Sequence, residues 1–561
     1  DALNANTTAS NNTAVGKSAL TANTTGTQNT ALGALALDAN TTANYCTAVG
    51  YGSLGANTTG TENSAVGRSS LLANTTGGKN VAVGSGTLAG NTTASSNTGL
   101  GWAALFTNTT GADNTAVGSS ALVANTTGAS NTAVGKNALV ANTTGHSNVA
   151  VGAEALDANT TAAANSALGY QALSATTTGA NNTAMGYQAL SLNTTAANNV
   201  ALGYRALQVN TAGTHNTAVG AGALDASTTG SDLTAVGYNV LGANTTGYSN
   251  VGVGGGASYA AAALATNTTG YGNSALGAGA LAQNTTGVGN CAVGRQSMYS
   301  STTGSNNIAM GDQSLDANTS GASNTALGTS ALGSNTTGLT NTAVGINAMA
   351  ANTTGSNNTA IGGGALATLT TGGNNIAIGL SAASWTAAGA LTTGGFNIHM
   401  GYATNPGAQD AANELVIATG NNGATGKGSN TGWFDNLTSG IYQVNNSASW
   451  ATTSDERLKK NIVDNNTGLS ILNQLQVKNF EHRLESEITE LPPEQRIKGE
   501  GVHIGVIAQE VQQILPECVT ELETGVLTVD TSNLTWYLIN SVKELSAQLD
   551  AALARITTLE G

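Results

Sequence analysis

Residues 454–462 read Ser-Asp-Glu-Arg-Leu-Lys-Lys-Asn-Ile and place a serine hydroxyl five positions before a lysine amine. A serine becomes a strong nucleophile only when a nearby base removes its proton. Lysine can be that base only in its neutral form, so its pKa must be lowered by burial or by nearby cations. Arg457 and Lys460 flank Lys459 and could lower that pKa. A solvated basic turn would show the same residues, so spacing alone leaves both interpretations open.

The charge distribution separates this motif from most of the chain. Residues 1–400 hold 16 charged side chains and residues 401–561 hold 30. The whole chain is only 8% charged, against roughly 25% in ordinary globular domains. We find no basic stripe, which argues against a nucleic-acid partner. The sequence also contains no run of about 20 apolar residues, so no membrane insertion is expected.

The three cysteines, Cys46, Cys291 and Cys518, lie far apart and form neither a disulfide nor a metal-binding pattern. They favour assembly in a reducing compartment, and no metal or other cofactor is expected.

A 17-residue unit, Asn-Thr-Ala-Val-Gly-x-x-Ala-Leu-x-Ala-Asn-Thr-Thr-Gly-x-x, repeats through residues 1–401. Its first glycine recurs from Gly16 to Gly254 in steps of 17, and again from Gly277 to Gly379 after a six-residue insertion. A five-residue insertion around Trp385 precedes Gly401, which completes 23 copies. We expect this glycine to adopt a backbone angle that other residues resist.

Each copy is too short for a pair of helices, and its apolar runs Thr-Ala-Val and Ala-Leu lie between glycine and asparagine turns. This pattern predicts an all-β repeat shaft, a β-solenoid whose 17-residue coils each contain two short strands. We expect one valine and one leucine of each coil to point inward, as in Val15 and Leu20, Val49 and Leu54, Val117 and Leu122. The recurring asparagines should form ladders of side-chain amides along the shaft, among them Asn23, Asn57, Asn74, Asn125 and Asn142.

The small number of large apolar groups in each coil favours a homotrimer whose chains share a core, with a single-chain solenoid as the alternative. The repeat resembles those of phage tail-fibre proteins and, less closely, the head repeats of trimeric autotransporter adhesins. The Asn-Thr-Thr triplets also match the N-glycosylation signal. Ice binding is disfavoured because adjacent threonines, such as Thr24 and Thr25, face opposite ways in a strand. The coils lack the aspartates of calcium-binding repeats.

Residues 402–453 differ in composition from the repeat and form a predicted cap or tip. Asn405-Pro406-Gly407 marks a turn, and Glu414-Leu415-Val416-Ile417 predicts a strand. Four aromatic residues gather here: Trp433, Phe434, Tyr442 and Trp450. Such residues suit receptor binding, including binding of a glycan, and they equally suit a small core that covers the unpaired edge of the last coil.

The chain from Ser454 to Gly561 resembles the self-cleaving intramolecular chaperone domain of phage endosialidases and tailspikes, which also occurs in the myelin regulatory factor. The pattern Ser-Asp-x-Arg-x-Lys of that family is present in full at residues 454–459. Residues 503–511 resemble its central strand and helix, with Pro516 ending the helix, and residues 529–545 resemble its closing segment. The resemblance implies a small α+β domain.

By this resemblance, Ser454 attacks the carbonyl carbon of Thr453, Lys459 is the activating base, and the chain is cut between Thr453 and Ser454. The domain would be a serine peptidase that acts once, on its own backbone. No enzyme activity is expected for the shaft.

Apolar residues near the end of the chain alternate four and three positions apart, at Leu538, Val542, Leu545, Leu549, Ala552, Ile556 and Leu559. This is the seam of a coiled coil, and we expect a helix that begins near Thr531, Ser532 and Asn533, which can cap it. A short three-stranded coil is favoured over an amphipathic helix on a globular core.

Together these features predict a viral tail fibre, a virion component that assembles in the host cytoplasm and attaches to a receptor on the host surface. Its C-terminal domain would drive trimer assembly and then cut itself off. The first alternative is an extracellular bacterial cell-surface adhesin that uses the same chaperone. A glycan-degrading tailspike is less favoured because it needs paired carboxylates, and the shaft holds only scattered acids such as Glu62, Asp113, Glu154 and Asp312.

Overall fold

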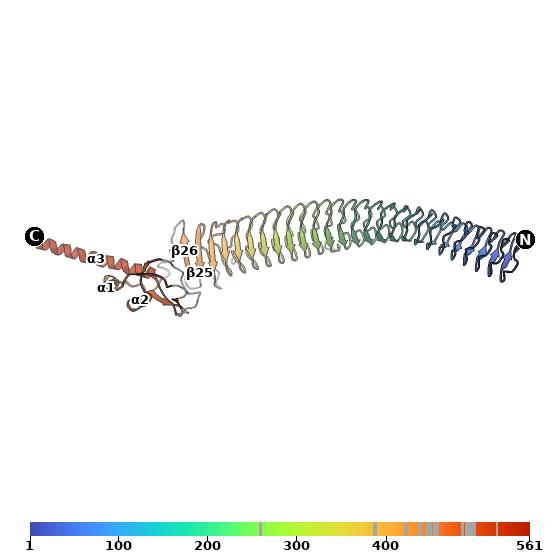
Figure 1. Cartoon of the computed structure of the whole chain (residues 1–561). Helices are drawn as coiled ribbons and strands as arrows, with labels where there is room; N and C mark the ends of the chain where they lie inside the picture. The colour runs from blue at the N-terminus through green and yellow to red at the C-terminus, as the bar shows by residue number, and fades with distance from the viewer. Residues whose placement is uncertain are drawn as a thin grey trace. The chain divides into compact units, whose positions relative to one another are not determined.

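The computed structural model describes the chain except residues 257–260, 385–389, 420–423, 436–439, 445–450, 453–458, 484–486, 489–500 and 523–524. The chain divides into two compact units, Asp1–Thr453 and Ser454–Gly561. Figure 1 shows the stacked coils of the first unit and the mixed helices and strands of the second. No helix in the part of the chain that the structure describes has the length and apolar character needed to cross a membrane.

The first unit is a β-solenoid of about 24 turns with 17-residue coils, as the repeat predicts. Each of the 23 copies contributes one strand of three residues. The strands are β1 (Thr13–Val15), β2 (Thr30–Leu32), β3 (Thr47–Val49), β4 (Ser64–Val66), β5 (Val81–Val83), β6 (Thr98–Leu100), β7 (Thr115–Val117), β8 (Thr132–Val134), β9 (Val149–Val151), β10 (Ser166–Leu168), β11 (Thr183–Met185), β12 (Val200–Leu202), β13 (Thr217–Val219), β14 (Thr234–Val236), β15 (Val251–Val253), β16 (Ser274–Leu276), β17 (Cys291–Val293), β18 (Ile308–Met310), β19 (Thr325–Leu327), β20 (Thr342–Val344), β21 (Thr359–Ile361), β22 (Ile376–Ile378) and β23 (Ile398–Met400).

Neighbouring strands pair in parallel, and each residue faces its equivalent in the next coil. In β8 and β9, for example, Ala133 lies opposite Ala150 and Val134 lies opposite Val151. The same pairing continues across the six-residue insertion, where β15 pairs with β16. Repetition of the sequence therefore becomes repetition of side chains in straight rows along the shaft.

The prediction that valine and leucine of each coil both point inward is half wrong. Leu20 is fully buried, whereas Val15 is 56% exposed and Val49 and Val117 are only half-buried. Successive side chains of a strand point to opposite faces. Because the central alanine of each strand points into the coil, as Ala133 does with no exposed surface, the residues on either side of it must point outward.

The second predicted strand of each coil does not form. The Ala-Leu segment is a tight turn, in which the leucine adopts the left-handed backbone conformation, with φ of 53° at Leu122 and 55° at Leu139. This conformation is uncommon for residues other than glycine. Here it turns the leucine side chain into the core, where both leucines are fully buried.

The repeat glycine occupies a position that only glycine can fill, as expected. Gly135 has a φ of 140°, outside the range that L side chains readily adopt. A Cβ atom at this position would also lie 2.4 Å from the carbonyl oxygen of Gly152 in the next coil. The close stacking of coils thus depends on a bare backbone here.

The predicted asparagine ladder is confirmed, and a second ladder runs beside it. In the predicted ladder, Asn142 Nδ2 donates to Asn125 Oδ1 at 2.8 Å. In the second, formed by the asparagine before each strand, Asn131 Nδ2 donates to Asn114 Oδ1 at 3.1 Å and Asn148 N donates to Asn131 Oδ1 at 3.0 Å. Both ladders lie inside the coils and hydrogen-bond backbone groups that would otherwise be buried without partners.

The leucine, alanine and asparagine rows fill the interior of a single chain. The leucines from Leu20 to Leu207 are its largest fully buried side chains. The premise that one chain cannot close its own core is therefore wrong, and a trimer must be argued from surfaces outside the coil.

The end of the solenoid is covered by four further strands, β24 (Leu415–Ala418), β25 (Thr431–Asp435), β26 (Gly440–Val444) and β27 (Ala451–Thr452). The first two continue the parallel sheet, and β26 and β27 then pair antiparallel. The predicted strand at residues 414–417 is confirmed within one residue. The change of direction ends the parallel ladder of the coils.

The described residues of the second unit form two small antiparallel sheets and three helices. Strand β28 (Lys478–Phe480) pairs with β29 (His503–Gly505), and β30 (Val519–Glu521) pairs with β31 (Leu527–Val529). The helices are α1 (Leu469–Leu472), α2 (Ala508–Ile514) and α3 (Thr531–Glu560), with a 3-10 turn at Pro516–Cys518. The strand and helix expected in residues 503–511 are present, and Pro516 follows the helix as predicted.

Helix α3 begins at Thr531, and its N-cap lies one residue before the first of the three predicted capping residues. The N-cap is Asp530, whose carboxylate accepts a hydrogen bond from Ser532 N at 2.9 Å, as carboxylates commonly do at helix N-termini. The larger seam residues point away from the rest of their unit and are 49–84% exposed: Leu538, Val542, Leu545, Leu549, Ile556 and Leu559.

Candidate functional site

Of the predicted serine and lysine, the structure describes only the lysine. Thr453 and Ser454, with the proposed scissile bond, lie outside the described residues. Lys459 and Lys460 are described, and both are exposed. The structure therefore places the lysines at the start of the second unit and leaves the geometry of the serine–lysine pair as a prediction.

The segment that follows the motif is held by helix α3. Asn540 Nδ2 donates to the carbonyl oxygens of Asn465 and Thr467, at 2.6 and 3.2 Å. Glu544 accepts a hydrogen bond from Leu469 N at 2.9 Å. These contacts join residues about 75 positions apart and fix the chain a few residues after the lysines, so α3 is part of the scaffold that positions the motif.

A small apolar core supports this scaffold. It consists of Val511 in α2, Leu515 at the C-cap of that helix, and Cys518 in the 3-10 turn. All three side chains are nearly or fully buried. Burial raises the pKa of the Cys518 thiol, which disfavours the reactive thiolate. Cys518 is thus a packing residue rather than a nucleophile.

The sheet of β28 and β29 carries an aromatic and histidine cluster. The ring of His503 lies 4.8 Å from that of His482 and 5.8 Å from that of Phe480, measured between ring centres. Lys478 forms an ion pair with Glu510 across the sheet and α2. Part of the chain next to this cluster, residues 484–486 and 489–500, is not described, so we assign the cluster a structural role only.

The aromatic residues of the cap do not share one environment. Trp433 is 8% exposed, and Lys427 Nζ lies 4.3 Å from the centre of its ring, a geometry suited to cation–π attraction. Phe434 is half-buried. The Tyr442 side chain and Trp450 lie outside the description. At Trp433 the structure agrees with the capping interpretation rather than with an exposed sugar platform.

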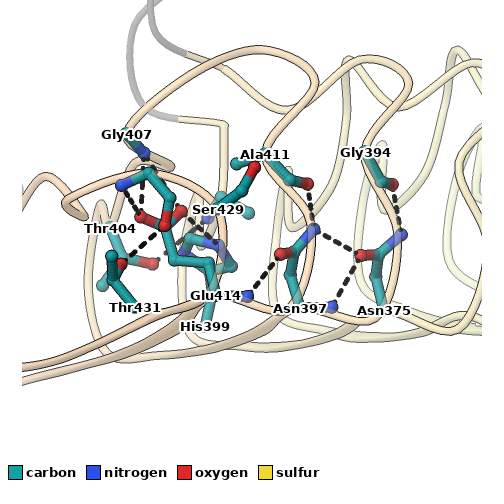
Figure 2. Close-up of polar contacts among 12 residues, drawn as sticks. Asn375, Gly394, Asn397, His399, Thr404, Gly407, Ala411, Glu414, Ser429 and Thr431 are labelled. Carbon is teal, nitrogen blue, oxygen red and sulfur yellow. Dashed lines mark hydrogen bonds and ion pairs between the residues drawn. The ribbon is translucent and has the colours of Figure 1, made fainter. Parts of the chain in front are cut away.

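The most unusual polar site of the described residues lies where the ladders end (Figure 2). Glu414 occupies the row of the second asparagine ladder, and its N–H donates to Asn397 Oδ1 at 2.9 Å. His399 occupies the row of the inward alanines, opposite Ala377. Both side chains have no exposed surface, and His399 Nε2 lies 3.9 Å from Glu414 Oε2.

The Glu414 carboxylate binds two loops of the cap. It accepts hydrogen bonds from Gly407 N at 3.0 Å and from Gly428 N at 2.6 Å. Burial raises the pKa of Glu414, while these backbone donors oppose the shift. Burial lowers the pKa of His399 to about 4, so its imidazole is neutral near pH 7. No substrate can reach either group, because both side chains are buried. We therefore interpret the pair as structural: it connects the last coils of the shaft to the loops of the cap.

Sequence reasoning missed this pair, although the repeat contains the signal. Counting from Asn375 and Asn397 places Glu414 in an asparagine row, and counting from Ala377 places His399 in an alanine row. A titratable residue in a row that is otherwise buried stands out once the row is known to point inward. No group of three or more metal-ligating side chains occurs among the described residues.

Comparison with known proteins finds one match, which lies in the second unit. Residues 454–520 match a protein-family model described as the chaperone of endosialidase. No curated protein and no solved structure matches the chain. The matched region starts at Ser454, the residue at which the second compact unit also starts. Together with the β-solenoid shaft, this match fits a tail fibre that carries a C-terminal chaperone domain.

Proposed function

We propose that this chain is the subunit of a homotrimeric viral tail fibre, and that its C-terminal domain guides assembly and then cuts itself off between Thr453 and Ser454. The observation that carries the proposal is the family match at residues 454–520, placed after a 23-copy solenoid and its cap. A long repeat shaft gives reach, and a chaperone domain at its end gives a means of assembling it.

The proposed cleavage needs only groups of this chain and one water molecule. Lys459 Nζ removes the Ser454 hydroxyl proton, and Oγ attacks the Thr453 carbonyl carbon. The peptide C–N bond breaks, the Ser454 nitrogen takes the proton to become a new N-terminus, and an ester links Thr453 to Oγ. Water then hydrolyses the ester to the Thr453 carboxylate and the free serine.

The test is the covalent state of the purified full chain. The wild-type protein should yield a fragment that begins at Ser454, identified by mass spectrometry and N-terminal sequencing. Ser454→Ala should remain intact, and Lys459→Ala should be nearly as resistant to cleavage. Lys460→Ala is the matched control, because it removes a neighbouring charge outside the motif, and it should still cleave. An intact wild-type chain in fully assembled fibres would refute the activity.

Helix α3 supports the trimeric part of the proposal. Its seam residues repeat with coiled-coil spacing and remain 49–84% exposed in one chain, an arrangement that three copies of the helix would bury. Lys543, Glu544 and Arg555 lie outside the seam. A 30-residue helix is about 45 Å long and carries four heptads.

Host attachment is proposed for residues 402–453, where the aromatic residues gather. Because Trp433 is buried, a receptor would have to contact other residues of this region, such as the half-buried Phe434. Binding of purified fibres to host cells, compared with binding of a fibre that carries Phe434→Ala, tests this assignment.

A further inference from the structure

One row of side chains on the outside of the shaft is aliphatic in every repeat. The third residue of each strand from β1 to β23 is valine, leucine, isoleucine or methionine, without exception. These residues do not belong to the interior of the coil. Thirteen of them are 36–56% exposed, for example Val15, Leu100, Leu168 and Met185, and the other ten are half-buried.

No other outward row behaves in this way. The position two residues after this row, for instance, reads lysine, alanine, tyrosine, arginine, serine and tryptophan at Lys17, Ala34, Tyr51, Arg68, Ser85 and Trp102. Outward positions of a solenoid that face water tolerate polar residues, as that position shows. The uniform aliphatic row therefore requires a partner that covers it along its whole length.

The face that carries this row is regular. The strands pair in parallel and in register from one coil to the next, so the row advances by about 4.8 Å per coil. The first residue of each strand points to the same face and is threonine, serine, valine, isoleucine or cysteine. The face is thus a strip of aliphatic and small side chains without a charge.

The size of the strip suits a stable protein interface. At roughly 50 Å² of exposed apolar surface per aliphatic side chain, the row offers on the order of 1,000 Å² per chain, more than the ~800 Å² that each partner buries in a standard interface. It also exceeds the apolar patch of a few hundred Å² found on ordinary monomers.

We propose that this strip is the surface through which the shafts of three copies of the chain pack side by side, with the aliphatic rows facing a common axis. Another copy of this chain is favoured as the partner that covers the strip. Only a chain with the same repeat presents an equivalent aliphatic row at the same spacing over all 23 strands. The inference rests on the proposed trimer and adds where the shafts touch. It gives the outward valines an apolar environment that their own coil does not provide.

The test uses thiol labelling of the full chain with a maleimide that cannot enter folded protein. Leu168→Cys places a thiol on the strip, at a side chain that is 44% exposed in a single chain. Thr178→Cys is the matched control, because Thr178 is exposed and lies in the coil that contains Leu168. Labelling of the unsubstituted protein corrects for its three cysteines, and mass photometry gives the number of chains.

The inference predicts a trimer in which the Leu168→Cys thiol reacts at least tenfold more slowly than the Thr178→Cys thiol. A trimer in which both thiols react equally fast would overturn the shaft interface while leaving assembly through the C-terminal domain intact. A monomer in which both react equally fast would overturn the interface and the trimeric function together. Aggregates that protect only the strip thiol would show an open-ended association instead of a closed trimer and would also overturn it.

Discussion

Replacing Asn131 by alanine removes one rung from the second asparagine ladder. The Asn131 amide donates to Gly145 O at 2.9 Å and to Asn114 Oδ1 at 3.1 Å, and it accepts from the N–H and Nδ2 of Asn148 at 3.0 and 3.2 Å. The Asn114 and Asn148 side chains keep other partners, Asn131 N and Ala162 O, and Gly145 O still accepts from Asn142 Nδ2 at 3.0 Å. The substitution therefore leaves one buried backbone group without this partner, the N–H of Asn148.

A buried group left without a hydrogen bond costs about 1–3 kcal/mol, so Asn131→Ala should destabilise the adjoining coils by about that amount. Solenoid stability is a sum of terms between neighbouring repeats, so the loss should be local. Hydrogen exchange measures such local opening. Amides of residues 114–165 should exchange roughly 5-fold to 150-fold faster, since 1.4 kcal/mol corresponds to a factor of ten, while distant coils stay unchanged.

Thr127→Ala is the matched control, because Thr127 is exposed in a neighbouring coil. Asn131→Leu is a second comparison, since Leu233 stands naturally in this ladder, is fully buried and still donates its N–H to Asn216 Oδ1 at 3.0 Å. It should be less damaging than alanine, because it fills the space. Exchange in Asn131→Ala within twofold of that in Thr127→Ala would show that the ladder does not stabilise the shaft.

Two further predictions concern the end of the shaft and the end of the chain. The pKa of His399 is about 4 in the folded chain and 6.5 in an unfolded one. The stability that the neutral imidazole contributes is therefore present above pH 6.5 and is lost as the pH falls toward 4. The free energy of unfolding should decrease by up to about 3 kcal/mol over this range. The raised pKa of Glu414 opposes part of this loss, and His399→Ala, which restores the alanine of the row, should flatten the dependence of cap unfolding on pH. An equally steep dependence in this variant would contradict the assignment. Leu549→Asp in α3 should dissociate the C-terminal domains in mass photometry, because it buries a charge in the proposed seam, whereas Lys543→Asp, outside the seam, should leave the number of chains unchanged.

The repeat made the solenoid predictable, because a strict period of 17 residues leaves few architectures and its asparagines could only be satisfied by stacking. What the sequence did not reveal was the path of the chain within a coil. An apolar valine in a short strand is expected to point inward. The structure shows that the alanine before it, such as Ala133, points inward instead. Because successive side chains alternate along a strand, Val134 then points outward. The left-handed leucines, such as Leu139 with a φ of 55°, could not be foreseen, since propensity places leucine in helices or strands.

Some features of the candidate sites could be predicted from the sequence and others could not. Sequence pattern pointed to the chaperone family, because Ser454 to Lys459 carry its motif. It missed the buried Glu414 and His399, whose role depends on which way each row points. Trp433 illustrates the limit for aromatic residues, because composition cannot distinguish a binding platform from a cap until burial is known.

The two proposed interfaces would solve different problems in the assembled trimer. A slip of one coil between chains, about 4.8 Å, sets each aliphatic residue of the strip against another aliphatic residue, so the strip alone barely distinguishes neighbouring registers. Within a coiled coil of α3 helices, a slip of three residues sets every second seam residue against a position outside the seam, as Leu545 against Gln548. A slip of one heptad restores the seam but leaves about a quarter of the 30-residue helix unpaired, whereas a slip of two coils leaves only two of the 23 strands unpaired. The helix therefore penalises a slip far more strongly than the shaft does, which explains why a fibre with a self-sufficient core would still need a C-terminal domain to align its chains.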